Sequence, residues 1–310
     1  MKVCIIGCGA IGSLYAAHLG KLDDVEVWAY DLNQAHVDAI NKNGLTLTGL
    51  SDFTSRVNAT SDVNEIPACD FGIIATKTMF TRAAMESVAK IFENGAVCSV
   101  QNGIGSEEIV AEYVSRVIQG TIFPAGHITE PGVVNHDAGG KTWIGPFATN
   151  PASMQEVEAL ADAINRSGME CLAMEDARGA QWTKVIFNAA SNAVAALTRL
   201  PHGVNCDQEG VRKLMSVIMA EGVAVSEALG ITLDSDPEKL TDFGREKAYY
   251  HPPSMLQDVM GERITEVDVL NGGIAKYGKE LGIPTPMNEA LTALIKGLEF
   301  SWSLEIPEKH

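Results

Sequence analysis

The first twelve residues of the chain constrain its fold more than any other segment. Val3–Ile6 is a short apolar run that predicts a buried parallel strand, and residues 13–19 predict a helix. Between them stand Gly7, Gly9 and Gly12 with G-x-G-x-x-G spacing. The first glycine permits a tight turn, the second lets backbone approach a pyrophosphate, and the third lets helix and strand pack closely.

This turn predicts dinucleotide binding, because the N-terminus of the following helix supplies free N–H groups and a positive dipole end for phosphates. The alternative is a glycine-rich turn in another kind of α/β protein. The predicted cofactor-binding residues of the turn are Gly7, Gly9, Ala10, Ile11 and Gly12.

The second predicted strand, residues 25–31, ends in an acidic residue. Asp31 follows Gly12 by 19 positions, close to the spacing at which a carboxylate binds the adenosine ribose hydroxyls. A carboxylate there also repels a 2′-phosphate, and no Lys or Arg follows until Lys42. Asp31 therefore favours NAD(H), with NADP(H) as the alternative. If Asp31 is only a turn residue at the strand end, it carries no cofactor preference.

Length and composition limit the class of protein. The 310 residues suit two domains, and 46% apolar residues suffice for a core. A formal net charge of −17 argues against nucleic acids and anionic membrane surfaces as partners. The six cysteines show no C-x-x-C pairs and no metal-ligand spacing, so we expect reduced core thiols, no metal and a cytoplasmic location. The early first strand predicts no signal peptide, and no apolar run approaches the roughly 20 residues of a membrane span.

Strands and helices alternate through the first half of the chain, which predicts a doubly wound, mostly parallel sheet. Further strands are predicted at 70–77, 96–103, 120–123 and 170–174, a hairpin-like pair at 132–136 and 142–145, and helices at 34–43, 81–92, 107–117 and 156–166.

From about residue 178 the pattern becomes helical. Helices are predicted at 180–197, 211–229, 239–250, 254–281 (with a break near Gly272-Gly273) and 288–300. We therefore predict an N-terminal α/β Rossmann domain over residues 1–177 and an all-α C-terminal domain over residues 178–310. Because no flexible linker separates them, we expect the two domains to share a cleft.

Polar residues close two of the predicted strands at the carboxyl edge of the sheet, where open α/β sheets bind ligands. Thr76-Lys77 ends one strand and Gln101-Asn102-Gly103 ends another. Lys77 is suited to a phosphate or ribose of the cofactor, and Asn102 to the nicotinamide or the substrate. The alternatives are a solvated lysine at a helix start and a type I′ turn at Asn102-Gly103.

The predicted helix at 180–197 carries a polar stripe. Lys184, Asn188 and Asn192 recur every four residues among apolar neighbours, so successive members turn by about 40° and line one face. A buried polar group without a hydrogen bond costs about 1–3 kcal/mol. The stripe therefore indicates either a ligand site or polar contacts between helices.

Two further polar positions lie in the helical half. Ser254 and Gln257 fit an S-x-x-Q capping box, a purely local role that would account for Ser254. Glu266 and Asp268 stand two residues apart, and spacing alone does not select one of them as a functional carboxylate.

The whole pattern resembles the ketopantoate reductase (2-dehydropantoate 2-reductase) family, nearly end to end. The family combines an N-terminal Rossmann domain with a C-terminal helical domain and has its active site in the cleft. The resemblance rests on the glycine turn, Thr76-Lys77, Gln101-Asn-Gly-Ile-Gly105, Lys184-x3-Asn188-x3-Asn192, Glu221, and Ser254-Met-Leu-Gln-Asp258 through Glu266 to Asn271-Gly272.

The resemblance implies reduction of a 2-oxo acid, foremost 2-dehydropantoate to (R)-pantoate. Lys184 would be the general acid that protonates the C2 carbonyl oxygen, and Glu266 would hold Lys184 and hydrogen-bond the substrate. An ammonium group stabilises the developing oxyanion, so no metal is needed. Further implied contacts are Asn102, Asn188, Asn192 and Ser254 to the substrate and Lys77 to the cofactor.

The chain departs from the family pattern at three places. Ala193-Val-Ala-Ala196 stands where many members have Pro-Leu-Thr-Ala, and His202-Gly203 stands where they often have Asn-Gly. His202 is thus predicted to alter the substrate pocket, unless it is an exposed loop residue after Pro201. The third departure is Asp31, in place of the basic or small residue of NADP-using members.

These departures keep other functions open. One is an NAD-dependent D-2-hydroxyacid dehydrogenase acting on a branched or aromatic substrate, like the D-mandelate-type enzymes of the family. A relative of the 3-hydroxyacid and 6-phosphogluconate dehydrogenases is disfavoured by the Gln-Asn-Gly and Ser-x-x-Gln-Asp segments. A non-catalytic NAD(H)-binding protein is the third alternative. Helical second domains of the superfamily often mediate dimers, which leaves a homodimer through this domain open.

Overall fold

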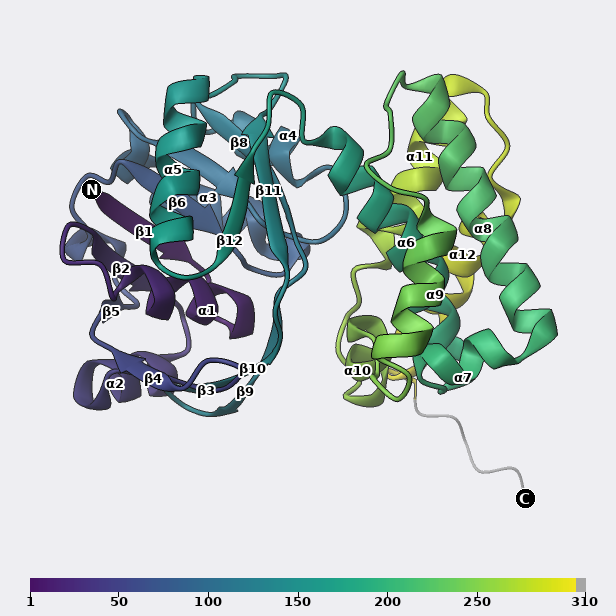
Figure 1. Cartoon of the computed structure of the whole chain (residues 1–310), viewed down its shortest axis with the longest axis horizontal. Helices are drawn as coiled ribbons and strands as arrows, with labels where there is room; N and C mark the ends of the chain where they lie inside the picture. Colours follow the sequence, from purple (N-terminus) through teal and green to yellow (C-terminus); the bar gives the residue numbers. More distant parts are fainter. Residues whose placement is uncertain (305–310) are drawn as a thin grey trace. The chain divides into compact units, whose positions relative to one another are not determined.

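In a computed structural model, which describes residues 1–304, the chain folds into two compact units (Figure 1). The first unit comprises Met1–Gln101 and Gly105–Ala177, and the second comprises Asn102–Ile104 and the chain from Arg178 onward. The short segment 102–104 is therefore part of the helical unit, although it lies in the middle of the first unit's sequence.

The first unit contains an eight-stranded sheet in the order β12-β11-β8-β7-β6-β1-β2-β5. Neighbouring strands are parallel except β8 and β11, which are antiparallel. The strands are β1 (Lys2–Ile6), β2 (Glu26–Tyr30), β5 (Asn58–Thr60), β6 (Phe71–Ile74), β7 (Ala96–Ser99), β8 (Val117–Ile122), β11 (Lys141–Pro146) and β12 (Glu170–Ala173).

The six parallel strands from β5 to β8 follow the Rossmann order 3-2-1-4-5-6 when numbered along the chain. The order reverses between β1 and β6, which makes the carboxyl ends of these two strands the topological switch point, where such sheets bind ligands. The predicted doubly wound, mostly parallel sheet is confirmed.

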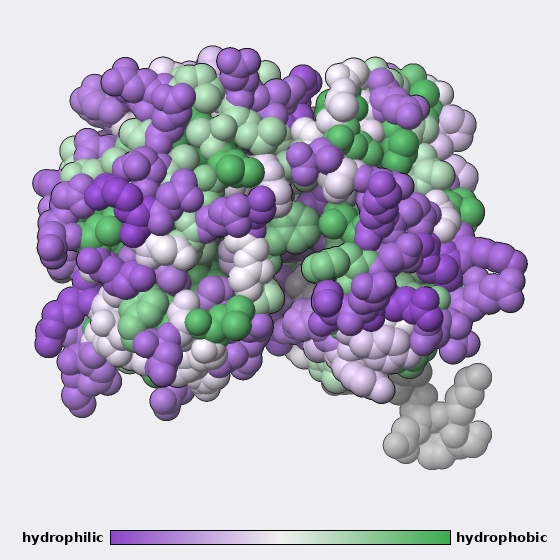
Figure 2. Space-filling model, viewed as in Figure 1, coloured by the Kyte–Doolittle hydropathy of each residue, from purple (hydrophilic) through white to green (hydrophobic). Residues whose placement is uncertain are grey.

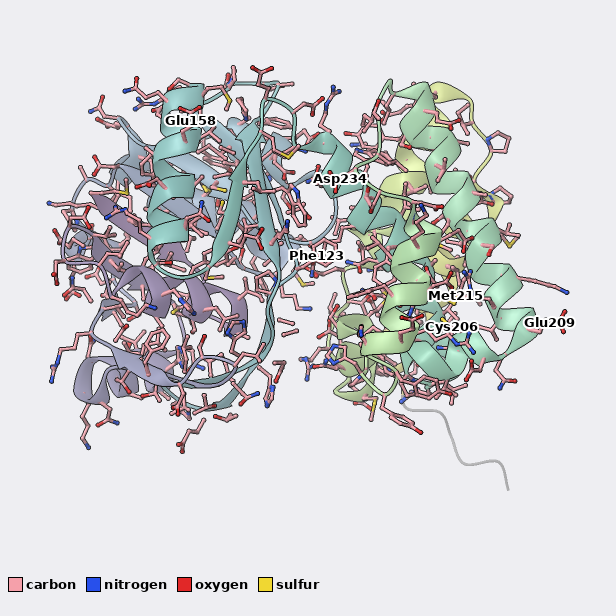
Figure 3. The ribbon with its side chains drawn as sticks, in the orientation of Figure 1. Phe123, Glu158, Cys206, Glu209, Met215 and Asp234 are labelled. Carbon is pink, nitrogen blue, oxygen red and sulfur yellow. The ribbon has the colours of Figure 1, made fainter. Side chains whose placement is uncertain are left out.

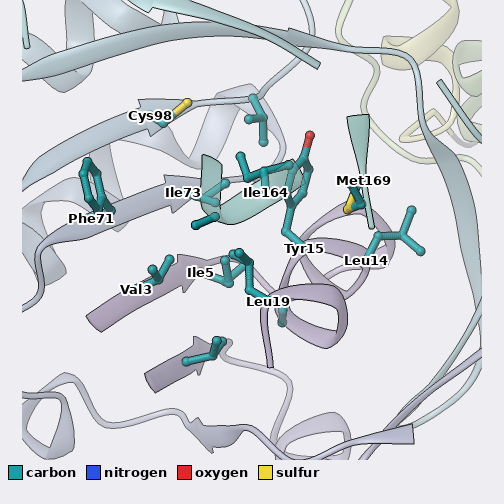
Figure 4. Packing of buried hydrophobic residues seen from close by; sticks show 14 of the residues in the cluster. Val3, Ile5, Leu14, Tyr15, Leu19, Phe71, Ile73, Cys98, Ile164 and Met169 are labelled. Atoms are coloured by element: carbon teal, nitrogen blue, oxygen red, sulfur yellow. The ribbon is translucent and has the colours of Figure 1, made fainter. Parts of the chain in front are cut away.

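Helices and apolar strands of this unit share a close-packed core, part of which Figure 4 shows. Ile5 and Ile73 from the sheet pack with Leu14 and Leu19 from α1, and all four are fully buried. Each such side chain contributes about 1.5–3 kcal/mol by leaving water. The helices are α1 (Ala10–Leu19), α2 (Gln34–Asn43), α3 (Thr81–Val88), α4 (Ser106–Ala111) and α5 (Met154–Arg166), with 3-10 turns at Val63–Glu65, Thr78–Phe80 and Ala89–Phe92.

A second, four-stranded sheet of the first unit has the order β4-β3-β10-β9. Its strands are β3 (Leu45–Gly49), β4 (Phe53–Ser55), β9 (Ala125–Glu130) and β10 (Val133–Ala138). The predicted hairpin of 132–136 with 142–145 is wrong: β10 pairs with β9 and β3, whereas β11 pairs with β8 and β12. The hairpin turn is Pro131-Gly132, where Gly132 adopts φ +80°.

The predicted helix over 107–117 is also too long, because α4 ends at Ala111 and β8 begins at Val117. The Asn150 side chain donates to the carbonyl oxygens of Ala111 (2.8 Å) and Val114 (3.0 Å). These bonds satisfy acceptors that a helix end leaves without partners, so the chain can turn and enter the sheet.

The second unit is helical, as predicted. Its elements are α6 (Arg178–Thr198), α7 (His202–Asp207), α8 (Glu209–Ala228), α9 (Pro237–Lys247), α10 (Ser254–Met260), the 3-10 turn η4 (Val267–Val269), α11 (Asn271–Leu281) and α12 (Pro286–Ser301). In Figure 3, Cys206 on α7 and Met215 on α8 are buried core residues, whereas Glu209 at the start of α8 is exposed.

The helix predicted over 254–281, with a break near Gly272-Gly273, is replaced by α10, η4 and α11. The chain leaves α10 at Gly261, and Glu262 takes a positive φ of +50° that a helix cannot accommodate. The break therefore comes about ten residues before Gly272-Gly273, which lie inside α11. Helix α7 is not predicted by the sequence pattern at all.

Hydrophilic residues cover much of the face of each unit drawn in Figure 2. Among residues 1–304, no helix combines the length and hydropathy that a membrane span requires. The six cysteines all lie in this part of the chain, and each is buried and free of disulfides, in agreement with the expected core thiols.

Candidate active site and cofactor-binding turn

The glycine-rich turn joins β1 to α1 at the switch point. Gly7 has φ +85°, and an ideal Cβ there would lie 2.5 Å from Cγ2 of Thr76, which follows β6. A Cβ at Gly12 would lie 2.0 Å from the carbonyl oxygen of Gly7. Around a Cβ at Gly9, by contrast, no atom of the described residues lies within 4 Å. Gly7 and Gly12 are thus required by packing, and the backbone at Gly9 is open to a ligand.

The N-terminus of α1 is left without a side-chain cap. Gly9 is the N-cap residue, and the first turn contains no acidic side chain. The N–H groups of Ala10, Ile11 and Gly12 therefore have no acceptor within the helix. Because these groups and the helix dipole favour an anion, the turn fits the pyrophosphate of a dinucleotide.

Asp31 lies directly after β2 and takes part in a local turn. Its Oδ1 accepts a hydrogen bond from the N–H of Asn33 at 2.8 Å, and its own N–H donates to the Thr60 carbonyl at 3.1 Å. No described residue donates a hydrogen bond to Oδ2. The turn role proposed as an alternative is therefore real, and it leaves one carboxylate oxygen for a ribose hydroxyl.

A buried histidine connects the glycine turn to the β9–β10 hairpin. His36 Nδ1 accepts from the N–H of Gly132 at 3.0 Å, so Nε2 carries the proton and donates to Ser13 Oγ at 3.3 Å. Ser13 Oγ in turn donates to the carbonyl of Cys8 at 3.0 Å. Burial lowers the pKa of His36, against the opposing charge of Asp31. The neutral ring therefore helps to fix the turn that begins α1.

Lys77 lies partly exposed at the end of β6, at the start of a 3-10 turn. The adjacent Thr76 is held by Gln101, whose side-chain amide donates to the Thr76 carbonyl (2.9 Å) and to Thr81 Oγ1 (2.8 Å). Gln101 therefore ties the ends of β6 and β7 together. This positioning role is not apparent from the sequence, which shows only a polar strand end.

In the second unit, three predicted site residues come together. Lys184 Nζ on α6 donates to Asn102 Oδ1 at 2.9 Å, and Asn102 Nδ2 donates to Glu266 Oε2 at 3.1 Å. Asn102 belongs to a strand-to-helix connection between β7 and α4, so the type I′ hairpin turn is wrong. The Asn102 amide is thereby placed between an ammonium group and a carboxylate.

Burial lowers the pKa of Lys184 to about 8, while the negative charge of Glu266 acts in the opposite direction. The structure also distinguishes the two candidate carboxylates. Glu266 is buried, whereas the Asp268 side chain is 60% exposed and pairs with Lys296. The arrangement therefore provides an ammonium group that can release and regain a proton near neutral pH, with Glu266 as its counter-charge.

The next residues of the polar stripe, Asn188 and Asn192, are also buried. Asn192 Nδ2 reaches Ser254 Oγ at a long 3.4 Å, and the Asn188 side chain makes no hydrogen bond to any described residue. The predicted capping box is wrong, because Pro253 is the N-cap of α10 and Ser254 is its first residue. Since no described residue hydrogen-bonds this amide, Asn188 favours a ligand site over polar contacts between helices.

His202, predicted to alter the substrate pocket, is held within the helical unit. It is buried on α7, so the exposed-loop alternative is wrong, and Nε2 donates to the Thr241 carbonyl at 3.0 Å. Nδ1 accepts a hydrogen bond from the Ser191 hydroxyl, with 2.6 Å between Nδ1 and Oγ. Both ring nitrogens are thus engaged, and these bonds do not support direct contact between His202 and a substrate. His202 contacts the polar stripe of α6 only indirectly, through its hydrogen bond with Ser191, the residue before Asn192.

Glu221, which contributes to the family resemblance, has a structural role. Its Oε1 accepts from the N–H of Met287 (2.9 Å), and its Oε2 accepts from the N–H (3.0 Å) and Nδ2 (2.7 Å) of Asn288. Asn271 donates to the Ala189 carbonyl and to Asn288 Oδ1, both at 3.0 Å. These residues cap α12 and bind it to the rest of the helical unit.

The Rossmann unit with its open glycine turn, and the helical unit with its partly buried lysine, define a two-domain dinucleotide-dependent oxidoreductase. The family model described as Ketopantoate reductase PanE/ApbA matches residues 3–149, and the model of its C terminal region matches residues 176–299. The chain therefore belongs to the ketopantoate reductase family.

Individual relatives agree with this assignment. The chain is 33% identical over 300 residues to a 2-dehydropantoate 2-reductase of Pyrococcus abyssi and 34% identical over 301 residues to one of Pyrococcus horikoshii, with 96% of this chain and 98% of each relative covered. A ketopantoate reductase structure from Ralstonia eutropha JMP134 has a TM-score of 0.88 at 30% identity, covering 98% of this chain and 100% of that chain. D-mandelate dehydrogenase with NADH and anilino(oxo)acetate also has a TM-score of 0.88, at 24% identity over 98% of this chain and 100% of that chain, and thus shares the fold.

Proposed function

We propose that this protein reduces 2-dehydropantoate to (R)-pantoate with a nicotinamide cofactor. The observation that carries the proposal is the Lys184–Asn102–Glu266 arrangement in a chain that aligns end to end with 2-dehydropantoate 2-reductases. The reduced cofactor, when bound, supplies a hydride to C2 of the substrate. The open N-terminus of α1, with Gly9, would hold its pyrophosphate.

Lys184 performs the proton chemistry. Its ammonium group donates a hydrogen bond to the C2 carbonyl oxygen and stabilises the negative charge that develops there as C2 is reduced. Nζ then transfers its proton to that oxygen, which completes the secondary alcohol, and regains a proton from solvent. With a pKa of about 8, Lys184 is protonated in most molecules at pH 7 and still acidic enough to donate.

Asn102 and Glu266 keep Lys184 ready for this step. The side-chain oxygen of Asn102 (Oδ1) accepts one hydrogen bond from the ammonium group and so orients Nζ. Glu266 favours the charged form of the lysine and fixes the Asn102 amide through Nδ2. Asn188, Asn192 and Ser254 supply amide and hydroxyl groups for the substrate's carboxylate and hydroxyl.

We further propose a preference for NAD(H), because Asp31 offers a free carboxylate oxygen at the end of β2. A 2′-phosphate beside this charge would be repelled. Wild-type protein should then show the higher kcat/KM with NADH, and Asp31→Asn should narrow the difference between the two cofactors. Preference for NADPH in the wild type would contradict this use of Asp31.

Substrate profiling tests the reaction. Purified protein is assayed with 2-dehydropantoate and with branched and aromatic 2-oxo acids, and kcat/KM is compared. We expect 2-dehydropantoate to be favoured by about a hundredfold, equivalent to about 2.7 kcal/mol. The same preference for another 2-oxo acid would establish a D-2-hydroxyacid dehydrogenase instead, and cofactor binding without turnover would establish a non-catalytic protein. Lys184→Ala should lower kcat by roughly 10²–10⁴ while cofactor still binds.

A further inference from the structure

Glu299, near the end of α12, is a buried carboxylate outside the site described above. It is 6% exposed, and acidic side chains are seldom buried to this extent unless they are paired and hydrogen-bonded. Its Oε1 accepts from both the N–H (2.8 Å) and the hydroxyl (2.7 Å) of Thr265. Its Oε2 lies 2.9 Å from Lys296 Nζ. Glu299 therefore fixes the residue immediately before Glu266.

The backbone on both sides of Glu266 is fixed as well. The Thr265 hydroxyl accepts from the N–H of Val267 at 3.2 Å, and so spans Glu266. The Glu266 carbonyl accepts from the N–H groups of Val269 and Leu270, both at 3.2 Å. Because these hydrogen bonds join Glu266 only to its near neighbours in the chain, the position of the turn depends on what holds Thr265.

Lys296, one helical turn before Glu299, holds the other end of the same segment. Its Nζ lies 3.0 Å from Asp268 Oδ2 as well as 2.9 Å from Glu299. Burial acts to raise the pKa of Glu299, but the ion pair with Lys296 and the hydrogen bonds from Thr265 outweigh it and hold that pKa below its ordinary value. Lys296 and Glu299, one turn apart on α12, thus hold the segment on both sides of Glu266.

We propose that Glu299 is a positioning residue for the reaction: by holding Thr265, it directs the Glu266 carboxylate at Asn102 and maintains the negative charge beside Lys184. The inference rests on the proposed function for its kinetic consequences. Without Glu299, Glu266 would lose its fixed orientation, the Asn102 amide would lose a steady acceptor, and the pKa of Lys184 would fall.

The test compares Glu299→Ala, Glu299→Gln and a matched control. In the control, Glu209→Gln removes the exposed ion pair with Lys213 (2.6 Å) on α8 of the same unit. Glu299→Ala should lower kcat by about 10–100-fold and move the loss of activity at high pH to lower pH. The KM for the cofactor should stay unchanged, because the glycine turn is part of the first unit. Glu299→Gln keeps an acceptor oxygen for Thr265 and should restore most of the activity, and Glu209→Gln should match wild type.

A second readout does not depend on substrate. In protein labelled with ¹³C at lysine Cε, an NMR titration gives the pKa of Lys184, with Lys184→Ala used to assign the signal. We expect a lower pKa in Glu299→Ala and a smaller decrease in Thr265→Val, which keeps the backbone hydrogen bond to Glu299. Thr265→Val also preserves the test if Glu299→Ala fails to fold.

An unchanged Lys184 pKa in folded Glu299→Ala or Thr265→Val protein would overturn the inference, even if kcat falls, because a merely structural role leaves that pKa in place. A wild-type protein inactive on 2-dehydropantoate would refute the proposed function and leave the NMR comparison valid. The two failures are therefore distinguishable.

Discussion

Glu266→Gln should move the pH dependence of 2-dehydropantoate reduction. The Asn102 amide links Lys184 Nζ (2.9 Å) to Glu266 Oε2 (3.1 Å), which limits their separation to about 8 Å. At an effective dielectric constant of about 20, a unit charge at this distance contributes about 2 kcal/mol, or about 1.5 pKa units. Glutamine can still accept from Asn102 but carries no charge. The pKa of Lys184 should therefore fall from about 8 to roughly 6.5.

The sign of the effect follows from the proposed role of Lys184 as the general acid. Only the protonated ammonium group donates, so activity is present below the lysine pKa and is lost as pH rises through it. At pH 7.5 the protonated fraction should drop from about three quarters to about one tenth, and kcat/KM should fall about eightfold. At pH 5.5 variant and wild type should nearly agree, since both lysines are then charged.

The assay is the initial rate of cofactor oxidation between pH 5.5 and 9.5 at constant ionic strength. Glu280→Gln serves as the control, because it removes one exposed carboxylate from α11 in the same unit. If Glu266→Gln and wild type lose activity over the same pH range at high pH, the electrostatic coupling between Glu266 and Lys184 is refuted. A wild-type profile without any loss of activity between about pH 7 and 9 would refute the depressed pKa of Lys184.

Three further predictions concern single contacts. Gly12→Ala places a methyl group 2.0 Å from the Gly7 carbonyl oxygen, so calorimetry should show at least tenfold weaker dinucleotide binding, about 1.4 kcal/mol, and unchanged affinity would contradict this. Ser13→Ala removes the hydroxyl between His36 and the glycine turn and should raise the KM for the cofactor several-fold. Steady-state kinetics should show that kcat at saturating cofactor is unchanged. Glu221→Ala removes three hydrogen bonds that cap α12 and should cost about 2 kcal/mol of unfolding free energy in urea titrations; a loss below about 0.5 kcal/mol would refute its capping role.

Features encoded by local spacing were predictable from the sequence. The glycine turn depends on residues within one strand-helix connection, and the stripe of Lys184, Asn188 and Asn192 follows from the period of a helix. Asp31 was also recognisable at its strand end, because both its turn and its free oxygen are local. These elements needed no knowledge of how distant segments meet.

Features created by distant contacts were not predictable. Thr265 and Glu299 are 34 residues apart in sequence, and no periodicity connects them. The pairing of β10 with β3 was missed for the same reason, since β3 lies far away along the chain. The hairpin partner β9 is local, and it was missed because residues 125–130 were not predicted to form a strand. The burial of His202 was not predictable either, because its hydrogen bonds to Ser191 and Thr241 join segments 11 and 39 residues away, whereas its neighbour Pro201 only suggested an exposed loop as the alternative.

The course of the chain between the two units limits how this enzyme can be divided. The polypeptide passes from one unit to the other at 101/102, at 104/105 and again at 177/178. A fragment that begins at Arg178 would keep Lys184 and lose its hydrogen-bond partner Asn102, which is encoded among the strands. A hybrid of two homologues joined at 177/178 would therefore combine the lysine of one protein with the 102–104 segment of the other. We expect such hybrids to require that residues 102–104 and the helical half be exchanged together.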